Sequence, residues 1–176
     1  MIDISPYNPD WPRQFSELRE RLSPCLGDVA AAIEHIGSTA VPGLAAKPVI
    51  DIDVVIPRHS KIITIIGRLA RLGYVHQGNL GIENREVFNA PPDPPLHHLY
   101  VCRRGSVALR NHLTFRDHLR RYPDDLAAYA TLKETLATTS ADADRYTSGK
   151  TDFVLSILSK YDFSEEELAE IRRPNG

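Results

Sequence analysis

The sequence predicts an α/β or α+β fold in which a sheet packs against a helical C-terminal half. Two observations lead to this prediction. Strand-like and helical segments are mixed in the first part of the chain, and from Ser106 onward every patterned segment has helical spacing. The chain has 176 residues, the usual length of about one domain, so we expect one domain over residues 1–176.

The composition excludes several classes of protein. With 42% hydrophobic and 25% charged residues, it is that of an ordinary soluble globular protein. A net charge of −2 provides no general attraction to nucleic acid or to membranes. The cysteines Cys25 and Cys102 form no motif and indicate a reducing compartment. We see no leader and no membrane-spanning run, so we expect a cytoplasmic protein.

The first elements follow from proline, glycine and periodicity. Residues 1–12 are rich in proline and predict an irregular arm. Pro12 can be the first residue of a helix over "PRQFSELRERLSPCLG", which we expect to end or break at Pro24 and Gly27. The segment "DVAAAIEHIG" is either a short helix or a strand. "PVIDIDVVI" alternates and is β-branched, so it is the clearest strand.

The remaining elements complete the pattern. "HSKIITIIGRLARLGY" predicts an amphipathic helix with Ser60 as its N-cap and Gly73 as its stop. "REVFNA" and "HHLYVCR" are strands, and the prolines of "PPDPP" between them predict a hairpin with an ordered loop. Residues 107–172 predict a helical part, interrupted at Pro123 and at "TTSADAD", with an acidic tail that forms a short helix or frays.

Asp51 and Asp53 are the first candidate site residues. Successive side chains of a strand point to opposite faces, so both carboxylates lie on one face, with their Cα atoms about 6.6 Å apart. Two carboxylates so close repel each other unless a cation lies between them. Their hard oxygen atoms predict Mg²⁺ or Mn²⁺. An equally good explanation is a strand that shows its polar face to water.

The residues just before this strand suggest phosphate binding. Gly37 allows the backbone to approach a ligand, and Ser38 and Thr39 offer hydroxyl groups beside it. Free N–H groups of a helical turn there would receive a phosphate, and Lys47 adds a mobile positive charge. Together these parts fit a metal-bound triphosphate in an in-line transfer. A plain turn explains the same residues.

The run "HIGSTAVPGLAAKPVIDIDV" resembles the signature of the GrpB family, small bacterial proteins with a nucleotidyltransferase-like fold. The match continues through "GIENREVFNAPPDPPLHHLYV", "LTFRDHLRRYP" and "YTSGKTDF", so it covers almost the whole chain. The resemblance implies an α+β fold, with a nucleotidyltransferase-like mixed sheet and helices packed against it. It also implies Gly37 and Ser38 for the turn and Asp51 and Asp53 for the metal.

Other candidates come from this resemblance. Active nucleotidyltransferases usually add a third carboxylate, for which Glu86 is a candidate and Asp93 a weaker one. The strand reads "HHLYV" where the family typically has His-His-Leu-His-Val, so Tyr100 replaces a histidine. His98 shares a face with Tyr100 and is expected in the site, although a hydrogen-bonded sheet histidine is the alternative.

Basic residues supply the last candidates. Arg85 and Lys150 lie in family-like segments, and Lys150 could reach the phosphates or tie the last helix to the sheet. Arg116 and Arg120 lie on one face of a helix in an arginine-rich stretch. This face could receive an anionic substrate or a docking partner, or it could be solvated with local ion pairs. Without interleaved aromatic residues, nucleic acid is not an expected partner.

The sequence therefore predicts a nucleotidyltransferase-type enzyme. It would transfer a nucleoside monophosphate from a nucleoside triphosphate to an acceptor, with Mg²⁺ or Mn²⁺ as cofactor. The alternative is a non-catalytic nucleotide-binding or regulatory module of the same fold, which the unassigned third carboxylate favours. The sequence leaves the nucleotide, the acceptor and the oligomeric state open.

Overall fold

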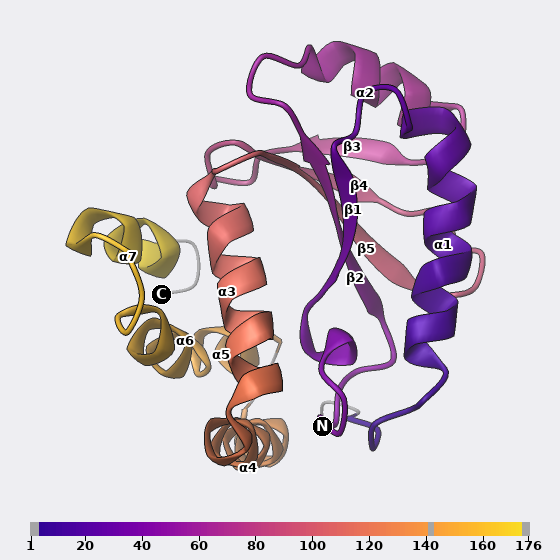
Figure 1. The fold of residues 1–176 in the computed structure, drawn as a ribbon. Coiled ribbons are helices and arrows are strands. Elements are labelled where there is room, and N and C mark those ends of the chain that lie inside the picture. The colour runs from indigo at the N-terminus through magenta and orange to yellow at the C-terminus, as the bar shows by residue number, and fades with distance from the viewer. Residues whose placement is uncertain (1–3, 141–142, 174–176) are drawn as a thin grey trace.

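A five-stranded mixed sheet forms the centre of the protein (Figure 1). The computed structural model describes residues 4–140 and 143–173. The strand order is β1-β2-β5-β4-β3; β2 and β5 are parallel and the other neighbours are antiparallel. The strands are β1 (Ala32–Ile36), β2 (Ile50–Ile56), β3 (Val75–Gly78), β4 (Arg85–Asn89) and β5 (His97–Arg103). The α+β fold class is confirmed, and β4 and β5 form the expected antiparallel pair.

Two helices from the first part of the chain cover one face of the sheet. They are α1 (Trp11–Leu26) and α2 (Ile62–Ala70). Leu18, Leu22 and Leu26 recur every four residues along α1, so they form one apolar stripe. This stripe is buried against the apolar side chains of β2, including Ile52. The main core therefore lies between α1, α2 and the sheet.

Several local predictions need correction. α1 continues through Pro24 and ends at Leu26, because tertiary packing of its apolar stripe holds the last turn in place. The N-cap of α2 is Lys61, so the prediction of Ser60 is wrong. The irregular arm stops at Asp10, since Trp11 already belongs to α1; its residues 1–3 lie outside the described part.

The sheet has two strands that the sequence did not resolve. The ambiguous segment after Gly27 contains β1, which pairs with β2. β3 was missed, because its residues "VHQG" include one apolar side chain and no alternating pattern. β3 forms the edge of the sheet, where little apolar surface is buried.

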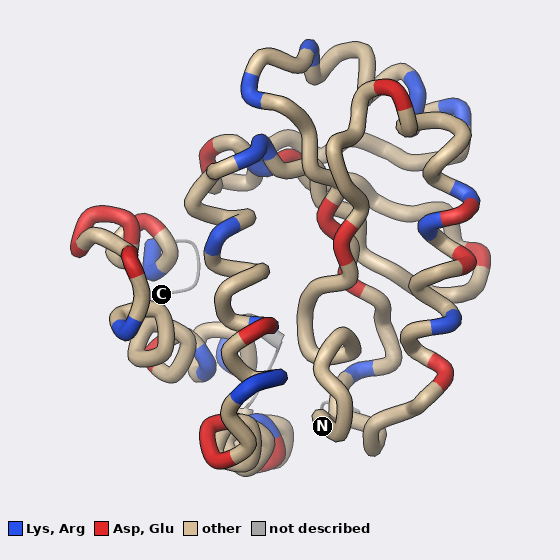
Figure 2. Tube along the Cα trace, in the orientation of Figure 1, with Lys and Arg blue, Asp and Glu red and all other residues tan. Residues whose placement is uncertain are grey.

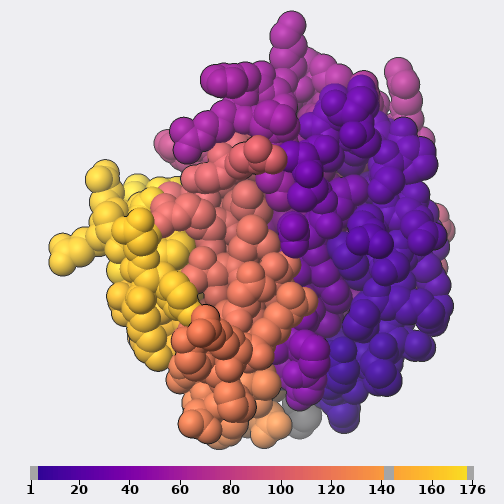
Figure 3. Space-filling view, viewed as in Figure 1, coloured from indigo at the N-terminus to yellow at the C-terminus, as the bar shows by residue number. Residues whose placement is uncertain are grey.

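The C-terminal half is helical, as predicted for residues 107–172. Its helices are α3 (Val107–Arg121), α4 (Pro123–Thr139), α5 (Ala143–Ser148), α6 (Thr151–Leu158) and α7 (Glu165–Arg172). Pro123 starts α4, while positions 141 and 142 of the predicted "TTSADAD" interruption lie outside the described residues. A capping box of Ser164 and Glu167 begins α7, so the acidic tail is a helix. This half lies along one side of the N-terminal half (Figure 3).

Arginines of α3 hold the two halves together. Nη1 of Arg116 donates to a carboxylate oxygen of Glu34 and to the carbonyl oxygen of His35, both at 2.9 Å. Arg120 donates to the carbonyl oxygen of Ala40 at 2.7 and 3.0 Å. The guanidinium of Arg116 is thus mostly buried. Both side chains thus bind the sheet half of the same chain; that this face receives an anionic substrate or a docking partner stays a prediction.

No helix in the described part of the chain is both long enough and apolar enough to cross a membrane.

The core between β2 and α1 should respond strongly to truncation. Ile52 is fully buried, so Ile52→Ala should lower the free energy of unfolding by about 2–5 kcal/mol. Ile63 of α2 is 70% exposed, so Ile63→Ala should change it by less than about 0.5 kcal/mol. Urea unfolding of both variants measures the difference, and similar losses would contradict the described packing.

Candidate functional site

The two faces of β2 have different partners. Ile50, Ile52 and Val54 belong to the core with α1 and α2. Asp51 and Asp53 point the other way, into the space between the sheet and α3, as their alternation predicted. Figure 2 shows a run of acidic positions along the paired strands β1 and β2, beside α3. The environments of the two aspartates nevertheless differ.

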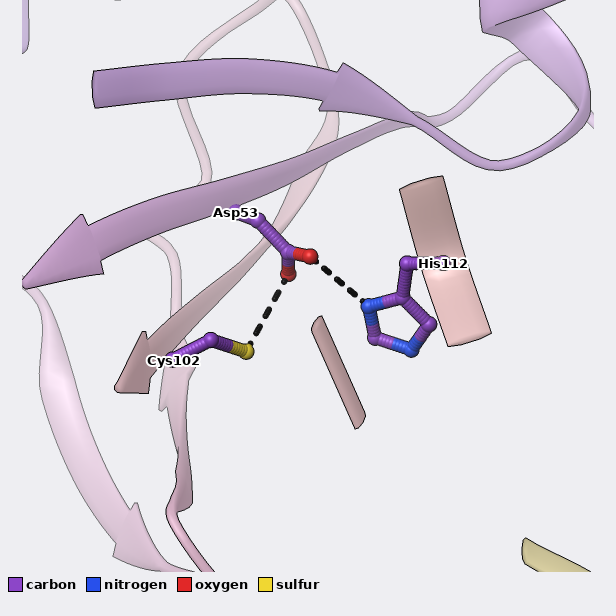
Figure 4. Close-up of side chains that lie close together, drawn as sticks. All are labelled: Asp53, Cys102 and His112. Carbon is purple, nitrogen blue, oxygen red and sulfur yellow. Dashed lines mark hydrogen bonds and ion pairs between the residues drawn. The ribbon is translucent and has the colours of Figure 1, made fainter. Parts of the chain in front are cut away.

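Asp53 is fully enclosed by protein groups. Its side chain has no exposed surface. One carboxylate oxygen accepts a hydrogen bond from Nδ1 of His112 at 2.8 Å, and the other faces Sγ of Cys102 at 3.6 Å (Figure 4). His112 comes from α3 and Cys102 from the neighbouring strand β5. Three elements thus meet at one buried carboxylate.

The buried charge of Asp53 shifts the pKa values of His112 and Cys102. Burial opposes protonation of His112, but the charge of Asp53 and its hydrogen bond outweigh burial and raise the pKa of His112. Burial, and then the charge of Asp53, raise the pKa of the Cys102 thiol. Cys102 is therefore a protonated thiol in this arrangement, and Asp53 makes the imidazolium form of His112 more favourable than in a free histidine.

Asp51 faces a pocket instead. Its Oδ1 accepts a hydrogen bond from Nδ1 of His98 at 2.9 Å, and this bond raises the pKa of His98. Gly37 lies directly against the same carboxylate. Its φ of +70° suits glycine, and a Cβ at this position would overlap Oδ2 of Asp51. Only glycine lets the turn approach the acid this closely.

The turn after Gly37 is held from behind. A short 3₁₀ turn (η1, Ser38–Ala40) follows it, and Ser38 lines the pocket. Oγ1 of the buried Thr39 shares a hydrogen bond with Nε2 of His35 at 2.9 Å. His35 stacks on Phe15 of α1, and burial lowers the pKa of His35 to about 4. The Thr39 hydroxyl therefore holds the turn, and Ser38 and Thr39 both line a pocket beside it.

Two adjoining pockets meet at Asp51. Their volumes are about 260 and 270 Å³. Arg85 and His112 line the first, and Lys47, Lys133 and His98 line the second. The residues that line both are Ser38, Asp51, Tyr100, Thr147 and Lys150. The pockets thus form one cleft with a carboxylate near its middle.

Lysines dominate the second pocket. Lys133 is 3% exposed and its Nζ donates to the carbonyl oxygen of Ala45. Burial lowers the pKa of Lys133 to about 7 and that of Lys150 to about 8. Nζ of Lys150 and of Lys47 lie 4.2 and 5.2 Å from the ring centroid of Tyr146. An anion between these lysines would stabilise their charged forms.

The remaining predicted residues divide between the two faces of the sheet. Arg85 lies on the pocket side with its guanidinium 5.1 Å from the ring centroid of Tyr100. Its buried Nε has no hydrogen-bond partner among the described residues. Glu86 lies on the opposite face, where it pairs with His76 at 2.7 Å. The structure therefore brings Arg85, Tyr100 and His98 to the cleft and keeps Glu86 away from it.

Asp93 also stays away from the two aspartates. The loop that carries it lies against α1, where Arg21 donates to the carbonyl oxygen of Pro94. Neither candidate for a third carboxylate thus reaches Asp51. Glu34 of β1 does share the aspartate face, opposite Asp53, but Arg116 already binds it.

Sequence reasoning missed four residues of this region: Cys102, His112, Lys133 and Tyr146. Lys133 carried a readable signal, because it lies four residues after Tyr129 on the apolar side of α4 and is buried there. Cys102 carried another, since it continues the alternation of His98 and Tyr100 along β5. The positions of His112 and Tyr146 at the site depend on how the helices that carry them pack, which no local pattern predicts.

Comparison with known proteins identifies the family. The model of the family described as GrpB protein matches residues 1–160. The chain belongs to the GrpB family. The GrpB chain is 34% identical over 154 residues to UPF0157 protein YqkA of Bacillus subtilis (strain 168). This alignment covers 87% of this chain and 45% of YqkA. It is 34% identical over 160 residues to UPF0157 protein SCO7215 of Streptomyces coelicolor, and this alignment covers 90% of this chain and 83% of SCO7215. The chain thus spans less than half of YqkA and most of SCO7215.

A solved GrpB structure has the same fold. The crystal structure of conserved protein GrpB from Enterococcus faecalis matches with a TM-score of 0.79 and 32% identity, over 96% of this chain and 98% of that one. A structure of the Cid1 poly(U) polymerase matches with a TM-score of 0.46 and 12% identity, over 74% and 45%. The Cid1 likeness is too distant to carry an argument about the GrpB site.

The GrpB site fits a hard cation at one aspartate. Asp51 lines the pocket with its side chain 27% exposed and Oδ1 bound to His98, and carboxylate oxygens are the kind of ligand that Mg²⁺ and Mn²⁺ prefer. Both oxygens of Asp53 already face His112 and Cys102. A cation shared by the two aspartates would require Asp53 to give up these partners.

The contact between Gly37 and Asp51 can be tested directly. Gly37→Ala should destabilise the protein, because a Cβ would overlap the Asp51 carboxylate at a positive φ. Gly81 has a φ of +80° and nothing within 4 Å of an added Cβ, so Gly81→Ala carries the backbone cost without the overlap. We expect Gly37→Ala to lose at least about 1 kcal/mol more in urea unfolding. Equal losses would show that the turn does not press on Asp51.

Proposed function

We propose that this GrpB chain binds a nucleoside triphosphate with Mg²⁺ in the joined pockets and transfers its nucleoside monophosphate to an acceptor. One observation carries the proposal. Asp51, with Gly37 against it, lies in a cleft whose other charged side chains, among the described residues, are lysines and arginines. A metal-bound polyphosphate is complementary to a carboxylate among lysines, because it presents a cation and several anionic oxygens together.

The lysine-rich pocket would receive the phosphates. Lys47, Lys133 and Lys150 line it, and the charge of Asp51 acts favourably on Lys133 and Lys150. Buried lysines with lowered pKa values gain most from a bound anion, since it removes the cost of their charge. Ser38 adds a hydroxyl at the same place.

The other pocket suits the less polar part of a nucleotide. Its lining combines apolar and aromatic side chains with a few polar ones: Val41, Phe115, Leu119, Tyr129, Val154, Asn111 and Arg85. Binding sites for bases and sugars have this mixture of apolar walls and few hydrogen-bonding groups. Arg85, whose buried Nε has no partner among the described residues, would bind an anionic or carbonyl oxygen there.

In the proposed reaction, an acceptor hydroxyl oxygen forms a bond to the α-phosphorus, the bond from that phosphorus to the α–β bridging oxygen breaks, and pyrophosphate leaves while the hydroxyl proton passes to water. Asp51 would hold Mg²⁺, which would supply charge neutralisation at the reacting phosphate. His98, hydrogen-bonded to Asp51, would orient its carboxylate. The lysines would stabilise the charge of the departing pyrophosphate.

A non-catalytic nucleotide-binding module is the second candidate. It is favoured by the enclosure of Asp53, which leaves Asp51 as the carboxylate open to the cleft, and by the position of Glu86 on the far face. Both candidates predict nucleotide binding. Release of pyrophosphate from a nucleoside triphosphate, followed by mass spectrometry of the mixture, distinguishes them.

Binding should depend on Asp51. We expect Mg²⁺ and a nucleoside triphosphate together to raise the melting temperature of the wild type, and Asp51→Asn to abolish this Mg²⁺-dependent shift. Glu86→Gln is the matched control, since it alters an acid on the opposite face, and should keep the shift. A thermal-shift panel with and without Mg²⁺ measures both, and an unchanged shift in Asp51→Asn would refute the proposal.

Nucleotide affinity should fall as pH rises from 7 to 9. Burial sets the pKa of Lys133 at about 7 and that of Lys150 at about 8, so both lose positive charge over this range. A bound phosphate favours the protonated lysines, hence the affinity is highest where they are charged and should weaken by about ten-fold across the range. Titration calorimetry at several pH values measures this change.

The pH prediction has a matched pair of variants. Lys150→Met should weaken binding at pH 7 and flatten the pH dependence, because a titrating cation is lost. Lys61→Met alters an exposed lysine at the start of α2 and should leave both unchanged. An affinity that rises with pH in the wild type would contradict a role for these lysines.

A further inference from the structure

The side chains of Asp53, Cys102 and His112 form a compact cluster of metal-binding atoms. A carboxylate oxygen, a sulfur atom and a ring nitrogen lie within 4.8 Å of one another. They come from β2, β5 and α3, and Figure 4 shows the three side chains converging. We propose that this cluster is a Zn²⁺ site, separate from the Mg²⁺ proposed at Asp51.

The donor set selects the metal. Zn²⁺ binds cysteine sulfur, histidine nitrogen and aspartate oxygen, and zinc sites with three protein ligands keep a fourth position open. Mg²⁺ and Ca²⁺ prefer oxygen ligands and gain little from sulfur. Cys102 therefore makes this a site for a softer ion, whereas the carboxylate of Asp51 offers only oxygen.

Burial and charge also favour a bound dication. Asp53 and Cys102 have no exposed surface, and a buried carboxylate is costly unless a positive group compensates it. The hydrogen bond from His112 supplies one such partner. On binding Zn²⁺, Cys102 would release its thiol proton and His112 its Nδ1 proton, both to solvent, and His112 would keep the proton on Nε2. The dication would then balance the carboxylate and the thiolate.

The cluster has an entry path through His112. This imidazole is 21% exposed and lines both the 260 Å³ pocket and a smaller one of about 120 Å³, which Arg85 also lines. Cys102 and Asp53 lie behind it, out of contact with solvent. An ion can therefore approach from the cleft and displace the His112–Asp53 hydrogen bond without unfolding the sheet.

The experiment uses Co²⁺ as a spectroscopic substitute for Zn²⁺. The full chain, stripped of metal with a chelator, is titrated with Co²⁺ and the thiolate-to-cobalt absorption band in the near ultraviolet is recorded. Zn²⁺ is then added as a competitor. We expect a band that saturates at one Co²⁺ per chain and disappears with Zn²⁺, while excess Mg²⁺ leaves it unchanged. Absence of this band in the wild type overturns the proposal.

Matched cysteine variants locate the ligand. Cys102→Ser should abolish the band and weaken Zn²⁺ binding at least about ten-fold. Cys25→Ser should keep both, since the Cys25 thiol lies between α1 and α2 and donates to the carbonyl oxygen of Arg68 at 3.3 Å. A band that survives in Cys102→Ser, or that is lost in Cys25→Ser, contradicts the assignment.

A third variant covers the case in which Cys102→Ser fails to fold. His112→Gln changes a ligand at the edge of the pocket and should weaken Zn²⁺ binding by a similar factor, with folding checked by circular dichroism. Unchanged Zn²⁺ affinity in this variant would overturn the site. The proposal does not rest on the proposed nucleotide reaction: no nucleotide is present in these assays, and Asp51→Asn should keep the cobalt band.

Discussion

The hydrogen bond between Asp53 and His112 is the constraint on which the site depends. A carboxylate without solvent exposure must have a partner inside the protein. His112 of α3 is that partner for Asp53. Arg116 and Arg120 of the same helix bind backbone carbonyl oxygens around the glycine turn. Because these contacts place α3 against β1 and β2, the helical half forms the second wall of the cleft.

This arrangement gives two neighbouring acids of one strand different roles. Asp53 is committed to His112 and Cys102, whereas Asp51 meets the cleft, His98 and the turn. Cationic side chains line the pocket around Asp51. Burial lowers the pKa of Lys133 because its charged form loses contact with water. The cleft therefore places a carboxylate among cationic side chains, as the proposed nucleotide binding requires, with a mixed oxygen, sulfur and nitrogen cluster beside it.

Sequence patterns predicted the placement of residues whose neighbours are close in the chain, or whose side of the sheet is set by the alternation of side chains along a strand. The shared face of Asp51 and Asp53 followed from the alternation of side chains along a strand, whereas Gly37 was predicted to approach a ligand and lies against the Asp51 carboxylate. The side chain of Glu86 was misjudged because its face depends on the register between β4 and β5, where it lies opposite Val101 of the apolar core. Arg116 was misread as a surface residue, because its partners Glu34 and His35 are about eighty positions away.

The resemblance to the GrpB family decided for the α+β class, which the patterns had left open between α/β and α+β. The sequence patterns by themselves determined the clearest strand, the helical half and the shared face of Asp51 and Asp53. These features depend on periodicity, glycine and proline, whose effects act over a few residues. Only the tertiary structure decided which acid faces the cleft, which lysines join it, and that Cys102 and His112 meet at Asp53. Those contacts arise where β2 and β5 pack against α3 and where α4 brings Lys133 to the cleft, and the periodicity within each segment does not say which other segments it packs against.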